Sequence, residues 1–182
     1  MPRRDLQSRF LISVCALTLA LGGLSVRADP AADYERGVQS FNAGDLVTAM
    51  QFLERAAEAG HPAAQFRYGY ILDQAEDNAT ALRYYRLAAE AGNADAAYAL
   101  GSMYASGDGT ARDYVQARAW FEKAADQGHN GALETLGIAH LEGGLGMEKN
   151  AELGRQLLQR AANSGYAPAR RQLQRASEAG TE

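Results

Sequence analysis

Residues 100–128 read LGSMYASGDGTARDYVQARAWFEKAADQG, and the spacing of their apolar residues predicts the fold class of the chain. Its first part places Leu100, Gly101 and Tyr104 at three- and four-residue spacing, on one face of a helix. Its second part carries a stripe of apolar side chains at the same spacing: Ala117, Trp120, Phe121, Ala124 and Ala125. Glycines around residue 108 separate the two parts. The stretch therefore predicts two amphipathic helices joined by a loop.

This pattern recurs along the chain. Its second part ends each time in a short motif that closes on glycine: AAEAG at 56–60 and 88–92, AADQG at 124–128 and AANSG at 161–165. The closing glycines are 32, 36 and 37 residues apart. A second row, with spacings of 32, 32 and 36 residues, consists of Gly37, Gly69, Gly101 and Gly137. Two rows that keep in step over this length predict a tandem array of helix pairs.

Residues with capping properties mark the expected helix ends. Asp45 and Asn150 stand where a side chain can cap the second helix of a unit, and Asp113 followed by Gln116 resembles a capping box. The closing glycines stand where the chain must turn left-handed out of a helix. Glycine inside a helix costs about 1 kcal/mol relative to alanine. The recurrence of Gly101 and its equivalents therefore predicts close approach to the alanines of the partner helix.

A longer signature surrounds these landmarks in the third unit. It consists of Leu100, Gly101, Tyr104, Gly107, Gly109, Asp113, Ala117, Trp120, Lys123, Ala124, Ala125 and Gly128. The signature resembles the SEL-one-like repeat, a relative of the tetratricopeptide repeat. The fourth unit matches with one extra residue and has His140 and Leu157 in place of the tyrosine and the tryptophan. The first two units are shorter, and the first is more similar to an ordinary tetratricopeptide unit.

The resemblance implies an all-α solenoid of antiparallel helix pairs. We expect one repeat domain over residues 29–182, with about four units at 31–61, 62–93, 94–129 and 130–166 and a capping helix at 167–180. The capping helix carries residues that suit the polar outer face at the end of a stack: Arg170, Arg171, Gln174 and Arg175.

The first 28 residues have the layout of a secretory signal peptide. Arg3, Arg4 and Arg9 precede an apolar run over residues 10–24, and Val26-x-Ala28 fits a signal-peptidase site. The mature chain is then expected to begin near Asp29, in the periplasm first and secreted next. The apolar run is shorter than the roughly 20 residues of a membrane-spanning helix, so an uncleaved anchor is the second interpretation.

Removal of residues 1–28 changes the charge and the thiol content. It takes four of the 18 basic residues and one of the 22 acidic residues, which leaves a net charge of −7. Such an acidic balance argues against nucleic acid or anionic lipid as a partner. Cys15, the only cysteine, is removed as well, so no disulfide is expected. After cleavage no stable membrane insertion is expected.

Residue patterns for catalysis or for metal ligation are sparse. His61 and His129 follow closing glycines in equivalent units, where a role in a turn explains both, and His140 replaces a packing tyrosine. The sequence has no histidines at metal-ligand spacing and no pair of a nucleophile and a base. The glycine-rich loops at 107–109 and 143–146 lack the strand and the lysine of a phosphate loop. We therefore expect no catalytic residue, no metal and no cofactor.

The expected binding surface lies on the first helix of each unit. The resemblance implies that these helices line a concave groove, in which aromatic side chains are typical anchors. The candidate groove residues are Tyr34, Phe41, Phe66, Tyr70, Tyr98, Ser102 and Ile138. The alternative is that some of these side chains pack between neighbouring units instead.

An extended groove favours a protein or a peptide as the partner. The resemblance implies a non-enzymatic adaptor or regulator. A secreted hydrolase or antibiotic-binding protein of the same repeat family is an alternative, although such relatives carry a cysteine pair in each repeat. An anchored envelope scaffold for polysaccharide or envelope assembly is another. Neither the partner nor the oligomeric state follows from the sequence.

Overall fold

The computed structural model describes residues 29–178, which fold into α-helices without any β-strand. The predicted signal peptide therefore lies outside the described residues. In chain order the helices are α2 (Pro30–Asn42), α3 (Leu46–Glu58), α4 (Pro62–Gln74), α5 (Asn78–Glu90), α6 (Ala94–Ser106), α7 (Tyr114–Asp126), α8 (Asn130–Glu142), α9 (Ala151–Asn163) and α10 (Ala167–Glu178). None of these helices is long and apolar enough to span a bilayer.

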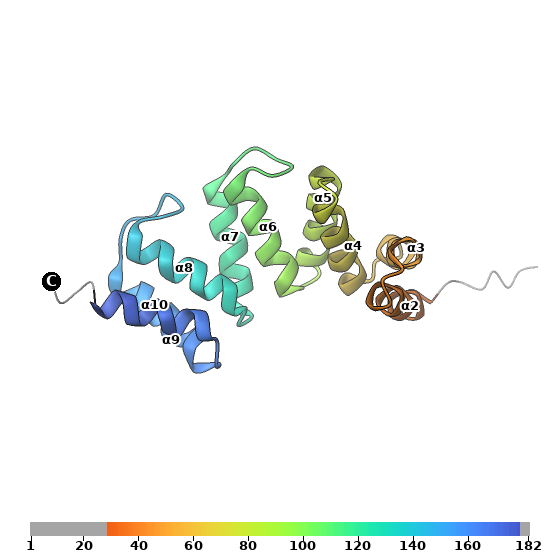
Figure 1. Ribbon diagram of the computed structural model, residues 1–182. Helices are drawn as coiled ribbons and strands as arrows, with labels where there is room; N and C mark the ends of the chain where they lie inside the picture. The colour runs from red at the N-terminus through yellow and green to blue at the C-terminus, as the bar shows by residue number, and fades with distance from the viewer. Residues whose placement is uncertain (1–28, 179–182) are drawn as a thin grey trace, which may run out of the picture.

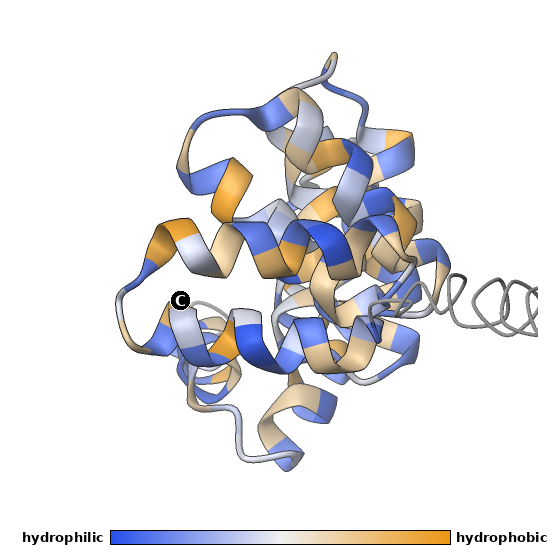
Figure 2. Cartoon of the chain, turned by 90° about the vertical axis from the view of Figure 1, so that its right-hand side faces the viewer, coloured by the Kyte–Doolittle hydropathy of each residue, from blue (hydrophilic) through white to orange (hydrophobic). Residues whose placement is uncertain are grey.

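The helices form four pairs: α2 with α3, α4 with α5, α6 with α7, and α8 with α9. The second helix of each pair also packs against the first helix of the next pair, so the pairs follow one another in a row (Figure 1). The remaining helix, α10, packs mainly against α9. This arrangement confirms the predicted all-α solenoid with a C-terminal helix. Hydrophilic and hydrophobic residues alternate along the helices, as amphipathic packing requires (Figure 2).

A side chain caps the start of each helix from α2 to α9. The predicted caps are confirmed: Asp45 accepts a hydrogen bond from the Thr48 amide, and Asn150 accepts one from Leu153. Asp113 caps α7 by accepting from the amides of Val115 and Gln116. The expected reciprocal half of that capping box does not form, because the Asp113 amide donates to the Tyr104 carbonyl instead.

The two rows of glycines determine the turns at the helix ends and the packing of the two helices within each unit. The closing glycines at 60, 92, 128 and 165 have φ between +81° and +92°, which confirms the predicted left-handed turn. The glycines inside the first helices do meet the partner helix closely, but the prediction that alanines lie opposite them is wrong. A Cβ atom built on Gly101 would lie 2.8 Å from the Phe121 ring. The large side chains opposite the glycine row are Leu53, Tyr85, Phe121 and Leu158.

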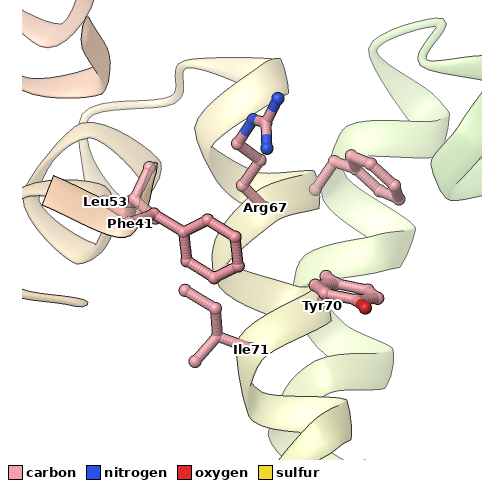
Figure 3. Close-up of a pocket in the computed structure, with 6 residues that line it drawn as sticks. Phe41, Leu53, Arg67, Tyr70 and Ile71 are labelled. Carbon is pink, nitrogen blue, oxygen red and sulfur yellow. The ribbon is translucent and has the colours of Figure 1, made fainter. Parts of the chain in front are cut away.

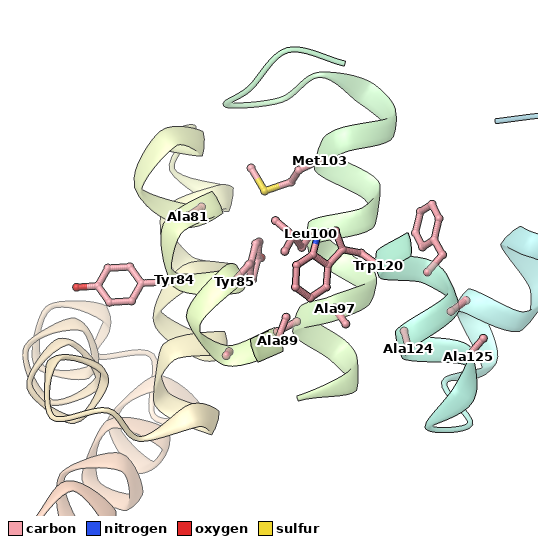
Figure 4. Packing of buried hydrophobic residues seen from close by; sticks show 14 of the residues in the cluster. Ala81, Tyr84, Tyr85, Ala89, Ala97, Leu100, Met103, Trp120, Ala124 and Ala125 are labelled. Carbon is pink, nitrogen blue, oxygen red and sulfur yellow. The ribbon is translucent and has the colours of Figure 1, made fainter. Parts of the chain in front are cut away.

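Each of these four large residues is almost fully buried. They stand 32, 36 and 37 residues apart, in step with the closing glycines. The glycine thus leaves a hole that one large side chain of the second helix fills, once in every unit. The buried side chains of the units join into one continuous core, in which Tyr85 of α5, Leu100 of α6 and Trp120 of α7 belong to three successive helices (Figure 4).

Glycine-rich loops in the third and fourth units contact the preceding unit. A Cβ atom on Gly109 would lie 2.5 Å from the carbonyl oxygen of Asn78, at the start of α5. The loop of the fourth unit contacts the third unit, because Arg118 of α7 donates hydrogen bonds to the carbonyls of Leu145 and Gly146. The turn between α4 and α5 is shorter, at residues 75–77, and lacks a glycine-rich segment.

Polar residues cover both ends of the described row. On α2 and α3, the Arg55 guanidinium lies 3.0 Å from the buried Asp33 carboxylate, and Arg36 and Arg55 both lie over the Phe52 ring. On α10 the exposed residues include the four polar side chains singled out from the sequence: Arg170, Arg171, Gln174 and Arg175. The exposed charged and amide side chains of α10 suit the polar outer face that the end of a repeat stack requires.

Candidate functional site

The candidate groove residues all lie on first helices, at three repeating positions. The first position holds Tyr34, Phe66, Tyr98 and Glu134; the second holds Val38, Tyr70, Ser102 and Ile138; the third holds Phe41, Asp73, Ala105 and Leu141. Equivalent positions have different surroundings in different units. The structure divides the candidates into those that line an apolar pocket, those that join neighbouring units, and Ser102 and Ile138, which do neither.

An apolar pocket of about 210 Å³ opens between α2, α3 and α4. It brings together three of the candidates, Phe41, Phe66 and Tyr70. Phe41 is 37% exposed and Tyr70 is 45% exposed, so two aromatic rings at this pocket are open to solvent. The Phe41 ring extends from α2 toward α4 (Figure 3). The remaining lining residues, which the sequence did not single out, are Leu53, Arg67 and Ile71.

Arg67 is the charged residue among the six that line the pocket. Its Nε donates to the Tyr34 hydroxyl at 3.2 Å, which holds the half-buried side chain in place. Among residues 29–178 its two Nη groups have no hydrogen-bond or ion-pair partner. Tyr34, another candidate, is not in the lining of the pocket but accepts the hydrogen bond that holds Arg67 there. The pocket combines an apolar interior with a guanidinium group whose outer donors are free for a ligand.

Tyr34 and Tyr98 also join neighbouring units. The Tyr34 ring stacks on His61 with 4.7 Å between ring centroids, and Tyr98 stacks on His129 at 4.5 Å. Each histidine caps the first helix of the next unit, because its Nδ1 accepts a hydrogen bond from a backbone amide. Tyr98 additionally packs on Phe121 at 5.6 Å. For Tyr98, packing between units thus accounts for the position of the ring.

Ser102 and Ile138 lie away from the apolar pocket. The Ser102 hydroxyl donates to the Tyr98 carbonyl within α6. Ile138 lines a second, larger hollow of about 440 Å³ between α8, α9 and α10, whose charged residues are Glu142, Arg155 and Arg175. The walls of this second hollow are mixed, with Ile138 and Leu141 beside its charged residues, whereas the pocket at α2, α3 and α4 has one charged residue in its lining.

Burial shifts the pKa of several tyrosine and histidine side chains that pack between helices. Burial, together with the Asp73 carboxylate, raises the pKa of Tyr85, whose hydroxyl donates to Asp73. Burial lowers the pKa of His129, and Asp95 opposes that effect from 3.3 Å. Within residues 29–178 no group of three or more His, Cys, Asp or Glu side chains is placed to hold a metal ion. The residues that line the pocket offer a ligand apolar contact and one guanidinium group.

A family model of the Sel1 repeat matches residues 31–61, 62–93, 94–129 and 132–166. The chain belongs to the Sel1-repeat family. This confirms the resemblance carried by residues 100–128, since the Sel1 repeat is related to the tetratricopeptide repeat. Sel1-repeat proteins generally mediate protein–protein interactions, and their fold is typically non-catalytic.

Two solved Sel1-repeat structures are similar to this chain. One is a protective antigen present in uropathogenic Escherichia coli strains, with a TM-score of 0.75 and 32% sequence identity over 79% of this chain. The other is a Sel1 repeat protein from Oxalobacter formigenes, with a TM-score of 0.73 and 25% identity over 80% of this chain. The match spans 32% of the first structure's chain and 61% of the second's. No curated protein matches this chain.

Proposed function

We propose that this Sel1-repeat protein is an exported, non-catalytic interaction module that binds a partner protein through the pocket between α2, α3 and α4. The observation that carries the proposal is the exposure of two aromatic rings, Phe41 and Tyr70, beside an open apolar cavity. Clustered exposed apolar groups commonly mark interaction sites, and aromatic residues are typical binding hot spots. An adaptor or a regulator requires such a surface and needs no catalytic group.

An exported location is the second part of the proposal. It is supported by the signal-peptide layout of residues 1–28 and by the similarity to a protective antigen of uropathogenic E. coli. The periplasm is the first expected compartment, and the extracellular medium is the next. Intact-mass measurement of the exported protein tests this part, with a mature start near Asp29 as the expected result. A chain that keeps residues 1–28 and sediments with membranes would replace this location with an anchored one.

Substitution of the exposed pocket aromatics tests the binding site. We expect Phe41→Ala with Tyr70→Ala to abolish capture of the partner from an envelope extract, because central aromatic anchors each contribute about 2 kcal/mol, or about thirtyfold in affinity. Pull-down with mass spectrometry identifies the captured protein. A thermal melt by circular dichroism is expected to stay near that of the wild type, since both rings are partly exposed.

Tyr114→Ala is the matched control for this experiment. Tyr114 is 39% exposed, close to the value for Tyr70, but it lies at the start of α7 and away from the pocket. The control is expected to retain the partner. Partner loss in the control, with retention by the pocket variant, would move the site to the starts of the second helices. Tyr98 is unsuited to this test, because its stacking on His129 couples it to the fold.

A further inference from the structure

We propose that the segment bound in this pocket carries an apolar side chain with an aspartate or glutamate side chain beside it. The apolar group fills the cavity, and the carboxylate pairs with Arg67 at the edge of the cavity. This inference rests on the proposed function and adds the chemistry of the partner to it. The size of the pocket, its walls and the free donors of Arg67 each constrain that chemistry.

The size of the pocket limits the apolar group to one side chain. The cavity volume is about 210 Å³. For comparison, an engineered apolar cavity of about 150 Å³ in another protein accommodates benzene. One aromatic ring or one branched aliphatic side chain therefore fits, whereas two large side chains do not. The bound segment consequently enters the pocket at one anchor position and continues outside it.

The walls of the pocket exclude a polar group from its interior. Phe41, Leu53, Phe66 and Ile71 present carbon atoms, and Tyr70 presents its ring. A polar atom placed among these groups would lose its hydrogen bonds to water without replacement. The buried anchor is therefore apolar, and any charge recognised by this site must lie at the edge.

Arg67 supplies the charge at the edge. The hydrogen bond from its Nε to Tyr34 leaves both Nη groups for a ligand. A guanidinium group matches the planar geometry of a carboxylate and binds it through charge-assisted hydrogen bonds. Partial burial beside apolar walls strengthens such a pair relative to a fully exposed one. Among residues 29–178 no acidic side chain is paired with Arg67, whereas Arg55 of α3 is paired with the Asp33 carboxylate.

Selection of peptides from a random display library on the full chain tests the inference. We expect the enriched peptides to share a large apolar residue with Asp or Glu within a few positions. Selected peptides are then synthesised with an amidated C-terminus, so that a terminal carboxylate cannot serve as the charged group. Fluorescence anisotropy compares each peptide with its Asp→Asn or Glu→Gln form, and we expect the amide form to bind about tenfold more weakly.

Arg67→Gln completes a double-mutant cycle with the peptide substitution. The variant is expected to bind the acidic peptide about tenfold more weakly and to bind the acidic and amide forms equally. Arg86→Gln is the matched control, because Arg86 also donates to a tyrosine hydroxyl, that of Tyr104, but lies on α5 and outside the pocket. This control is expected to keep the preference for the acidic peptide.

Several outcomes would overturn the inference. Peptides that lose binding with Tyr70→Ala but show no preference between acid and amide would contradict the charge pairing and leave the proposed function intact. Peptides that bind equally to the Tyr70→Ala variant would contradict the proposed function itself. Concentration-dependent dimerisation that Tyr70→Ala abolishes, measured by light scattering, would show that a second copy of the chain fills the pocket instead.

Discussion

Gly101 and its equivalents are constrained by the size of the side chain opposite, and the constraint differs between units. The distance from a Cβ atom built on the glycine to the nearest side-chain atom is 2.7 Å at Gly37, 2.8 Å at Gly101 and at Gly137, and 3.1 Å at Gly69. Contacts below 3.0 Å require a neighbour to move. The neighbours are buried, close-packed side chains that cannot move freely. The cost of adding one methyl group should therefore follow these distances.

We predict that Gly101→Ala lowers the stability of the fold and that Gly69→Ala is better tolerated. Alanine gains about 1 kcal/mol of helix propensity over glycine, whereas overpacking a core costs about 1–3 kcal/mol. The net loss at Gly101 should reach about 2 kcal/mol, and the effect at Gly69 should stay within about 1 kcal/mol of zero. Urea unfolding followed by circular dichroism measures both. Equal effects at the two sites would show that the distances do not determine the cost.

Helix starts couple each unit to the one before it. His61 and His129 cap α4 and α8 and stack on tyrosines of the preceding units. Asn93 caps α6 at the equivalent position. The sequence predicts that both histidines lie in turns, because each follows a closing glycine. It did not identify them as caps, since histidine is not among the residues that commonly cap helices. Capping by Nδ1 requires that this nitrogen carries no proton.

We predict that His129 makes the stability of the fold depend on pH. Burial lowers the pKa of His129 from its ordinary value of 6.5, so the folded state favours the neutral imidazole. Its contribution to stability is complete above pH 6.5 and is lost as the pH falls below that value toward the folded-state pKa. Protonation at Nδ1 would also remove the acceptor that caps α8. Thermal melts at a series of pH values measure the effect.

His129→Asn is the matched control, since asparagine caps the equivalent helix at Asn93. The variant keeps a cap that does not titrate in this range. We expect its melting temperature to decline less than that of the wild type as the pH falls from 7 to 5. An identical decline in both proteins would assign the acid sensitivity to other groups.

Periodicity made the solenoid predictable from the sequence, whereas the pocket depends on contacts between units. The two glycine rows repeat in every unit, so Gly37 and Gly101 indicate the same packing. The pocket lies where Phe41 and Phe66 from different units meet Leu53 of α3. The third position of the first helices holds Asp73 in the next unit, so the aromatic pattern does not recur. Which side chains meet across units depends on how the pairs pack, and no repeat spacing specifies that.

The face formed by the first helices thus has distinct parts. The end at α2 and α4 has an apolar pocket with Arg67 at its edge, and the end at α8 and α10 has a hollow whose lining includes Arg155 and Arg175. Between these two ends, Tyr98 is engaged in packing against His129. Under the proposed function, we therefore expect one side chain of the bound partner segment to enter the pocket.

Site-specific photocrosslinking in cells that produce the full chain tests the proposed binding site most directly. A photoreactive phenylalanine analogue replaces Tyr70 at the pocket in one strain and Tyr114 at the start of α7 in another. We expect a crosslinked partner at position 70 and none at position 114, because Tyr70 lines the pocket and Tyr114, which is exposed to a similar extent, does not. A crosslinked partner at position 114 with none at position 70 would contradict the proposed binding site.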